Sequence, residues 1–149
     1  MGWVGYFCEV DGEAAVNAVD LDVEAPQAER PMIVYLRVGR DPEEPCDLSP
    51  EEEADLLDAI EAHVELLAAR YEAVYVGRST TAMARVFVCY ASVFTILRHR
   101  FERAFEQLRS YGYYYHTASG RDADWTVYRK FLRPGPNELA AIEARAKRA

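Results

Sequence analysis

The chain has 149 residues, of which 50% are hydrophobic, 28% charged and 12% aromatic. A single domain of this length buries about 70% of its unfolded surface, so it can build a core without disulfide or metal staples. The apolar content excludes disorder over most of the length, and no apolar run approaches the roughly 20 residues that span a bilayer. We therefore expect one folded domain and no membrane segment.

The net charge of −8 is unevenly distributed along the chain. Residues 1–70 hold 18 acidic and 4 basic side chains, whereas residues 71–149 hold 7 acidic and 13 basic ones. A negative field opposes non-specific binding to nucleic acid and favours a basic protein partner. The alternative is that two oppositely charged halves pack together or face solvent.

The three cysteines, Cys8, Cys46 and Cys89, form no CxxC pair and show no metal-ligand spacing. We accordingly expect no metal and no cofactor. The odd cysteine count, together with a start that lacks a basic region and a long apolar stretch, predicts a cytoplasmic protein.

The N-terminal part of the chain predicts three strands. Trp3–Val10 reads as a strand that ends in a hairpin turn at Asp11-Gly12. From Glu13 to Glu24 the apolar residues alternate but change sides near Ala18-Val19, which predicts a bulge. The apolar run Met32–Gly39 predicts a third strand.

A helix begins after Ser49, because Ser49 can cap it, Pro50 suits the first helical position and Glu52 completes a capping box. Apolar residues at helical spacing predict its inward face. That face comprises Leu57, Ile60, Val64 and Leu67. Acidic residues at the same spacing predict its outward face, which comprises Glu51, Asp55, Asp58 and Glu65.

The second half of the chain predicts three strands, two helices and a tail. The five elements before the tail are strands at 73–77 and 83–91, a helix at 92–109, a strand at 112–117 and a short helix capped by Asp122; a terminal helix or tail follows at 137–149. From residue 32 the order is strand, helix, strand, strand, helix, strand. This order predicts an α+β, ferredoxin-like fold, a split βαβ antiparallel sheet with both helices on one face, preceded by an N-terminal β-hairpin. We expect one domain over residues 1–136.

Several short motifs resemble a bacterial family catalogued as domain of unknown function 695. They are Trp3, Tyr6 and Asp11-Gly12; Leu48-Ser49-Pro50 with Glu52-Glu53; Tyr75 to Thr81; Arg85, Phe87 and Tyr90; and Asp122 to Trp125 with Tyr128, Phe131-Leu132 and Pro134. The resemblance covers the chain up to about Pro136. It implies an association with, or similarity to, the B-type regulator of ribonuclease E activity, a small acidic protein inhibitor with a related α+β fold.

The acidic face Glu51, Asp55, Asp58 and Glu65 is the first candidate site. Like charges at this spacing destabilise a helix by a few tenths of a kcal/mol, and a basic partner would relieve them. The alternative is a solvated face. We expect a non-enzymatic acidic module that regulates or inhibits a basic protein, such as a nuclease, or acts as an immunity-type protein.

Two further functions stay open. Arg78, Arg85, His116 and Trp125 would bind a small ligand or anion, or serve an enzyme, if they converge at one end of the sheet. RNA binding would need Tyr35, Phe87 and Tyr113 exposed on one sheet face. Aromatic residues on an uncovered sheet face would also support a homodimer.

Overall fold

The computed structural model describes residues 2–43, 45, 46 and 48–148. The chain opens with a hairpin of strands β1 (Trp3–Val10) and β2 (Glu13–Asp20). Asp11 and Gly12 join them with φ angles of 52° and 82°. Two successive positive φ angles are typical of the tight turn that matches the twist of paired strands, so the predicted hairpin is confirmed.

The helix predicted after Ser49 is α1 (Pro50–Arg70), and the capping box is present. Glu52 donates its N–H to the Ser49 Oγ at 3.2 Å, and the Glu52 carboxylate accepts the Ser49 N–H at 3.1 Å. These two bonds satisfy backbone donors that a helix start leaves free, which sets the first residue of α1.

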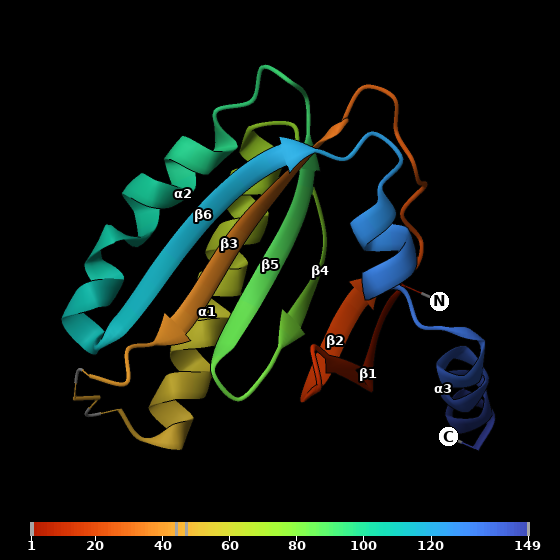
Figure 1. Cartoon of the computed structure of the whole chain (residues 1–149), viewed down its shortest axis with the longest axis horizontal. Helices are drawn as coiled ribbons and strands as arrows, with labels where there is room; N and C mark the ends of the chain where they lie inside the picture. The colour runs from red at the N-terminus through yellow and green to blue at the C-terminus, as the bar shows by residue number, and fades with distance from the viewer. Residues whose placement is uncertain (1, 44, 47, 149) are drawn as a thin grey trace.

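The other elements follow the predicted order with shifted ends (Figure 1). They are β3 (Met32–Arg40), β4 (Val74–Thr80), β5 (Ala84–Ala91), α2 (Leu97–Phe105), the 3-10 helix η1 (Glu106–Tyr111), β6 (Tyr113–Arg121), the π-helical segment η2 (Val127–Leu132) and α3 (Pro136–Arg148). The terminal helix expected at 137–149 is α3; Ala149 lies outside the described residues.

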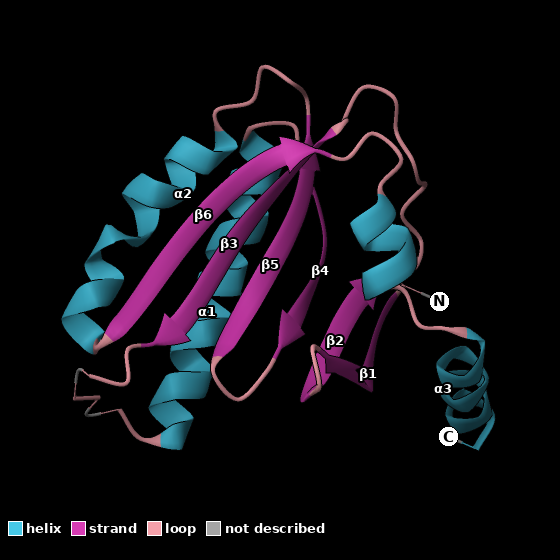
Figure 2. Ribbon diagram, in the orientation of Figure 1, coloured by secondary structure: helices cyan, strands magenta, loops and turns pink. Residues whose placement is uncertain are grey.

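All six strands form one antiparallel sheet in the order β1-β2-β4-β5-β3-β6 (Figure 2). The α+β class is therefore confirmed. The hairpin joins the rest of the sheet through β2 and β4, whose backbones come very close at Gly77. A Cβ built on Gly77 would lie 2.7 Å from a backbone oxygen of β2, so only glycine fits there.

Helices α1 and α2 pack on the same face of the sheet and form the first core with it. Its fully buried members include Leu36 and Phe87 from the sheet, Val64 from α1 and Phe101 from α2. Alternate residues of the same strands face the other way. On that second face Val88 and Tyr90 pack beneath the segment that carries η2.

The second core joins the two ends of the chain. Trp125, Tyr128 and Leu132 contribute from η2 and the residues before it, and Tyr6 and Val19 contribute from the hairpin. Ile142 of α3 packs in the same cluster. Tyr6 donates a hydrogen bond to the Leu132 carbonyl, and Tyr128 donates one to the Asp20 carbonyl at 2.6 Å. The hairpin is thus fastened to η2 as well as to the sheet.

Three predicted details are wrong. The pairing of β1 with β2 runs without a break from Trp3 to Val10, so there is no bulge at Ala18-Val19; a register shift occurs instead in β4, between Tyr75 and Gly77. The predicted helix at 92–109 begins only at Leu97. The last strand continues to Arg121, because Met32 to Val34 of β3 pair with residues 119–121.

Candidate functional site

The four acidic residues of the predicted outward face, which we call the acidic stripe, are all exposed on α1. They are Glu51, Asp55, Asp58 and Glu65. The burial of Ile60, Val64 and Leu67 against the sheet fixes the rotation of the helix. Residues three and four apart share a face, so fixing one side of α1 also turns the acidic stripe to solvent.

None of the four stripe carboxylates makes a salt bridge with another described residue. The salt bridges of α1 are made by two other carboxylates, at the sides of the helix. The Glu53 Oε2 lies 3.9 Å from the Arg40 Nη1, and Glu61 pairs with Arg78. Among the described residues the stripe therefore forms no ion pair, although Arg85 attracts Asp58 at longer range. Its field extends about 8–10 Å into solvent at ordinary ionic strength.

Glu61 connects α1 to the sheet next to the stripe. Its carboxylate accepts a hydrogen bond from the Tyr75 hydroxyl at 2.7 Å and pairs with the Arg78 guanidinium. Burial, together with the adjacent carboxylate, raises the pKa of Tyr75 well above its ordinary value. The phenol therefore stays protonated and keeps donating, which holds this corner of α1 against β4.

An exposed apolar surface lies beside this corner, on the hairpin. It consists of Trp3, Phe7 and Val16, which are 44%, 80% and 42% exposed, and we call it the hairpin patch. Phe7 lies opposite Val16 in the register of the hairpin, and the Trp3 ring lies 5.3 Å from the Tyr75 ring. Since Tyr75 in turn bonds Glu61, the patch and the flank of α1 are continuous.

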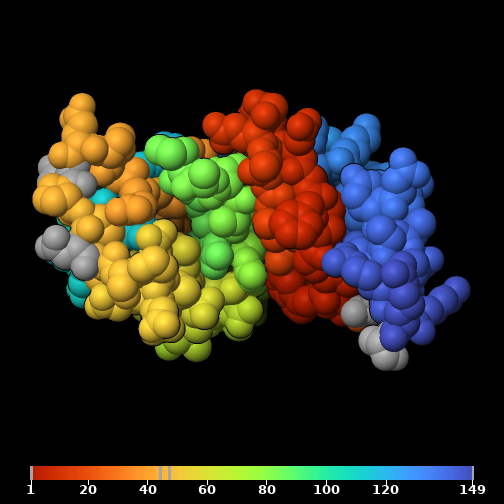
Figure 3. Space-filling view, turned by 90° about the horizontal axis from the view of Figure 1, so that it is seen from below, coloured from red at the N-terminus to blue at the C-terminus, as the bar shows by residue number. Residues whose placement is uncertain are grey.

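Figure 3 shows α1, the β4–β5 turn and the hairpin next to one another on a single face of the molecule. The hairpin patch was not predicted from the sequence. Its signal was present, since apolar residues at 14, 16 and 18 lie on one side of the strand. The predicted change of sides near Ala18-Val19 is wrong, because Ala15 and Val19 both lie on the opposite, buried side of β2.

The structure brings together only two of the four residues predicted for a ligand or anion site. Arg78 and Arg85 lie on neighbouring strands, and Arg85 donates its Nε–H to the Thr80 hydroxyl at 3.0 Å. Burial, then the nearby Arg78, lowers the pKa of Arg85. His116 is exposed on β6, at the far edge of the sheet.

Trp125 is fully buried and belongs to the second core. Its ring stacks on Tyr90 with centroids 4.1 Å apart, and its Nε1–H donates to the Arg30 carbonyl at 2.8 Å. The four residues therefore do not share one pocket. Trp125 also has φ 54°, a left-handed conformation that a non-glycine residue adopts only where packing compensates.

The aromatic residues required for RNA binding do not share an exposed face. Phe87 is fully buried and Tyr113 is 3% exposed, both beneath the helices. Tyr35 faces the other way, because its neighbour Leu36 is the residue opposite Phe87. The geometry that this hypothesis requires is therefore absent from these three positions.

Comparison with known proteins yields a family and no characterised relative. Searches of curated proteins and of solved structures find no match. Among the described residues no helix is long and apolar enough to cross a membrane. The family model described as a family of unknown function, DUF695, matches residues 1–133. Since that match spans most of the chain, the protein belongs to the DUF695 family.

Proposed function

We propose that the protein is a non-enzymatic module that binds a basic partner protein through the acidic stripe and the hairpin patch together. The observation that carries this proposal is the continuity of the two surfaces. Phe7 is 80% exposed on the hairpin. Trp3 contacts the ring of Tyr75, whose hydroxyl bonds Glu61 of α1. The outward carboxylates of α1 have no salt bridge within the described residues.

The two surfaces supply different parts of recognition. Buried aromatic side chains at the centre of an interface contribute most of its affinity, and Trp3 and Phe7 are available for that role. Unneutralised carboxylates speed association with a positive surface and reject negative ones. A basic nuclease that the protein inhibits, or a basic toxin that it neutralises, would fit both surfaces.

Two finer assignments accompany the proposal. The order β4-β5-β3-β6, with α1 and α2 on one face, supports a ferredoxin-like split βαβ unit to which the hairpin is added. The free state of Cys8, Cys46 and Cys89 is consistent with a reducing compartment, and we place the protein in the cytoplasm.

The test is affinity capture from native lysate at about 50 mM and 300 mM salt, since screening at the higher concentration weakens surface electrostatics. The test bait carries Asp58→Lys and Glu65→Lys. These two residues flank Glu61, so they are the stripe residues closest to the hairpin patch.

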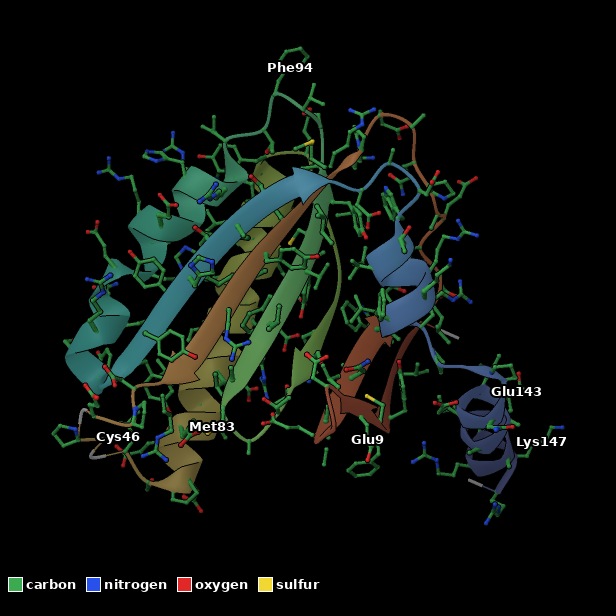
Figure 4. All side chains as sticks on the ribbon, viewed as in Figure 1. Glu9, Cys46, Met83, Phe94, Glu143 and Lys147 are labelled. Atoms are coloured by element: carbon green, nitrogen blue, oxygen red, sulfur yellow. The ribbon has the colours of Figure 1, made fainter. Side chains whose placement is uncertain are left out.

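The control bait carries Glu106→Lys and Glu143→Lys, the same change in charge at two exposed positions outside α1. Glu143 lies on α3, far from α1 (Figure 4). We expect the wild type and the control to retain one basic protein at low salt and the test bait to lose it. With that protein purified, the test variant should associate at least about tenfold more slowly. Equal retention by both variants would contradict the proposal.

A further inference from the structure

A cavity of about 680 Å³ opens on the face of the sheet opposite α1 and α2. Its floor is a row of residues that runs across the strands, perpendicular to them. Each residue of this row is paired with the next one on the neighbouring strand. The row is Tyr6, Asn17, Ser79, Val86 and Arg37. Five of the six strands thus contribute to the cavity.

The cavity exists because this face is only partly covered. The segment with Trp125 and Tyr128 packs over Tyr90, whereas Val86 and Tyr35 remain half-buried at the cavity floor. The wall opposite β3 is formed by the hairpin, which hydrogen bonds hold in place. The Asn17 Nδ2 donates to the Tyr6 hydroxyl at 3.1 Å and to the Phe131 carbonyl at 3.2 Å.

Asn17 has an unmet hydrogen-bonding requirement beside the cavity. The residue is 2% exposed, and its Oδ1 has no partner among the described residues. The amide cannot simply be turned round, because the Phe131 carbonyl only accepts hydrogen bonds and therefore requires the Nδ2. A buried acceptor left without a donor is unfavourable, and a donor delivered from the cavity would satisfy it.

Charges of both signs line the cavity. The carboxylates come from the hairpin and α3, as Glu9, Asp11 and Glu138. The cations come from β3 and from residues 130 and 133. Arg37 is exposed and meets the Tyr114 hydroxyl at 3.4 Å, and neither Arg37 nor Lys130 makes a salt bridge with a described residue. An anionic group would therefore be attracted to Arg37 and Lys130 and repelled from the hairpin tip.

We propose that this cavity binds a small amphipathic organic anion, with its apolar body against Val86 and Val88 and its anionic group at Arg37 and Lys130. The volume lies within the range of about 300–1,000 Å³ that is usual for small-molecule sites, and such sites combine an apolar lining with a few fixed polar groups. The inference is independent of the proposed protein partner, because the two surfaces lie on opposite faces of the sheet.

The test uses two matched fluorescent probes, 1-anilinonaphthalene-8-sulfonate and its uncharged counterpart N-phenyl-1-naphthylamine. Titration in about 150 mM salt should give saturable, one-to-one binding of the sulfonate. Arg37→Glu should weaken the binding of the sulfonate at least tenfold and change that of the uncharged probe less than twofold. Val86→Trp should abolish the binding of both, because the indole fills the cavity floor.

Arg121→Glu is the matched control, with the same change in charge at an exposed residue that does not line the cavity. Near-ultraviolet circular dichroism of each variant excludes probe binding by a loosened state. If Val86→Trp does not fold, Lys130→Glu at an exposed rim position replaces it, with the effect expected of Arg37→Glu. Non-saturable binding, or equal weakening by Arg37→Glu and Arg121→Glu, would overturn the proposal.

Discussion

Replacing Trp125 by Phe tests whether this residue belongs to the core or to a ligand site. The indole is fully buried, stacks on Tyr90 at 4.1 Å and donates a hydrogen bond of 2.8 Å to the Arg30 carbonyl. A phenyl ring loses that bond, which costs about 1–2 kcal/mol. Its smaller surface loses about 1 kcal/mol of ring contacts. We expect the free energy of unfolding to fall by about 2–3 kcal/mol.

The assay is urea denaturation followed by far-ultraviolet circular dichroism, which does not depend on the fluorescence of the substituted residue. A thermal melt gives a second measure. In a chain of this size each kcal/mol of lost stability lowers the melting temperature by about 2–4 °C, so we expect a fall of about 4–12 °C. Trp3→Phe is the matched control. Trp3 is 44% exposed, so its replacement should cost less than about 1 kcal/mol. Unchanged unfolding of Trp125→Phe would refute the core assignment and restore a ligand role.

Three other substitutions test local features of the fold. Ser49→Ala removes the side chain that accepts the N–H of Glu52 and should cost about 1 kcal/mol in a thermal melt; no loss would mean that the capping box does not hold the start of α1. Gly77→Ala places a Cβ 2.7 Å from a backbone oxygen of β2 and should cost about 1–3 kcal/mol in urea, whereas a neutral result would contradict the close approach of the two strands. Burial alone would raise the pKa of Asp122, but hydrogen bonds from backbone N–H groups and from the Tyr90 hydroxyl lower it below its ordinary value. The resulting stabilisation is present above the unfolded-state pKa of about 4 and is lost as pH falls through the folded-state pKa, so Asp122→Asn should flatten the pH dependence of the melting temperature in acid.

Local sequence patterns predicted those elements whose ends are set by their own residues. The capping box fixed the start of α1, and the turn at Asp11-Gly12 fixed the hairpin. The end of β6 could not be predicted this way. Ser119 and Gly120 favour a break, but they lie opposite Val34 and Ile33 of β3, and that pairing continues the strand. Pairing between distant residues here overrides local preference.

The same distinction applies to the candidate sites. The exposure of the acidic stripe follows from helical spacing alone, so it was predictable. The burial of Trp125 could not be predicted in this way. It depends on the left-handed backbone of Trp125 itself and on its contact with Tyr90 of β5, which lies 35 residues earlier in the sequence. The cavity was missed for a related reason. Its floor takes single residues from five strands, and no local pattern signals a transverse row.

The bond between Tyr6 and Leu132 joins residues 126 positions apart, and it has a consequence for synthesis of the chain. At about 5–20 residues per second, the ribosome adds Leu132 roughly 6–25 s after Tyr6. During that interval the hairpin lacks the segment that fastens it, and the hairpin patch together with Tyr6 and Val19 is accessible to chaperones. The N-terminal strands are therefore made first but reach their final packing among the last.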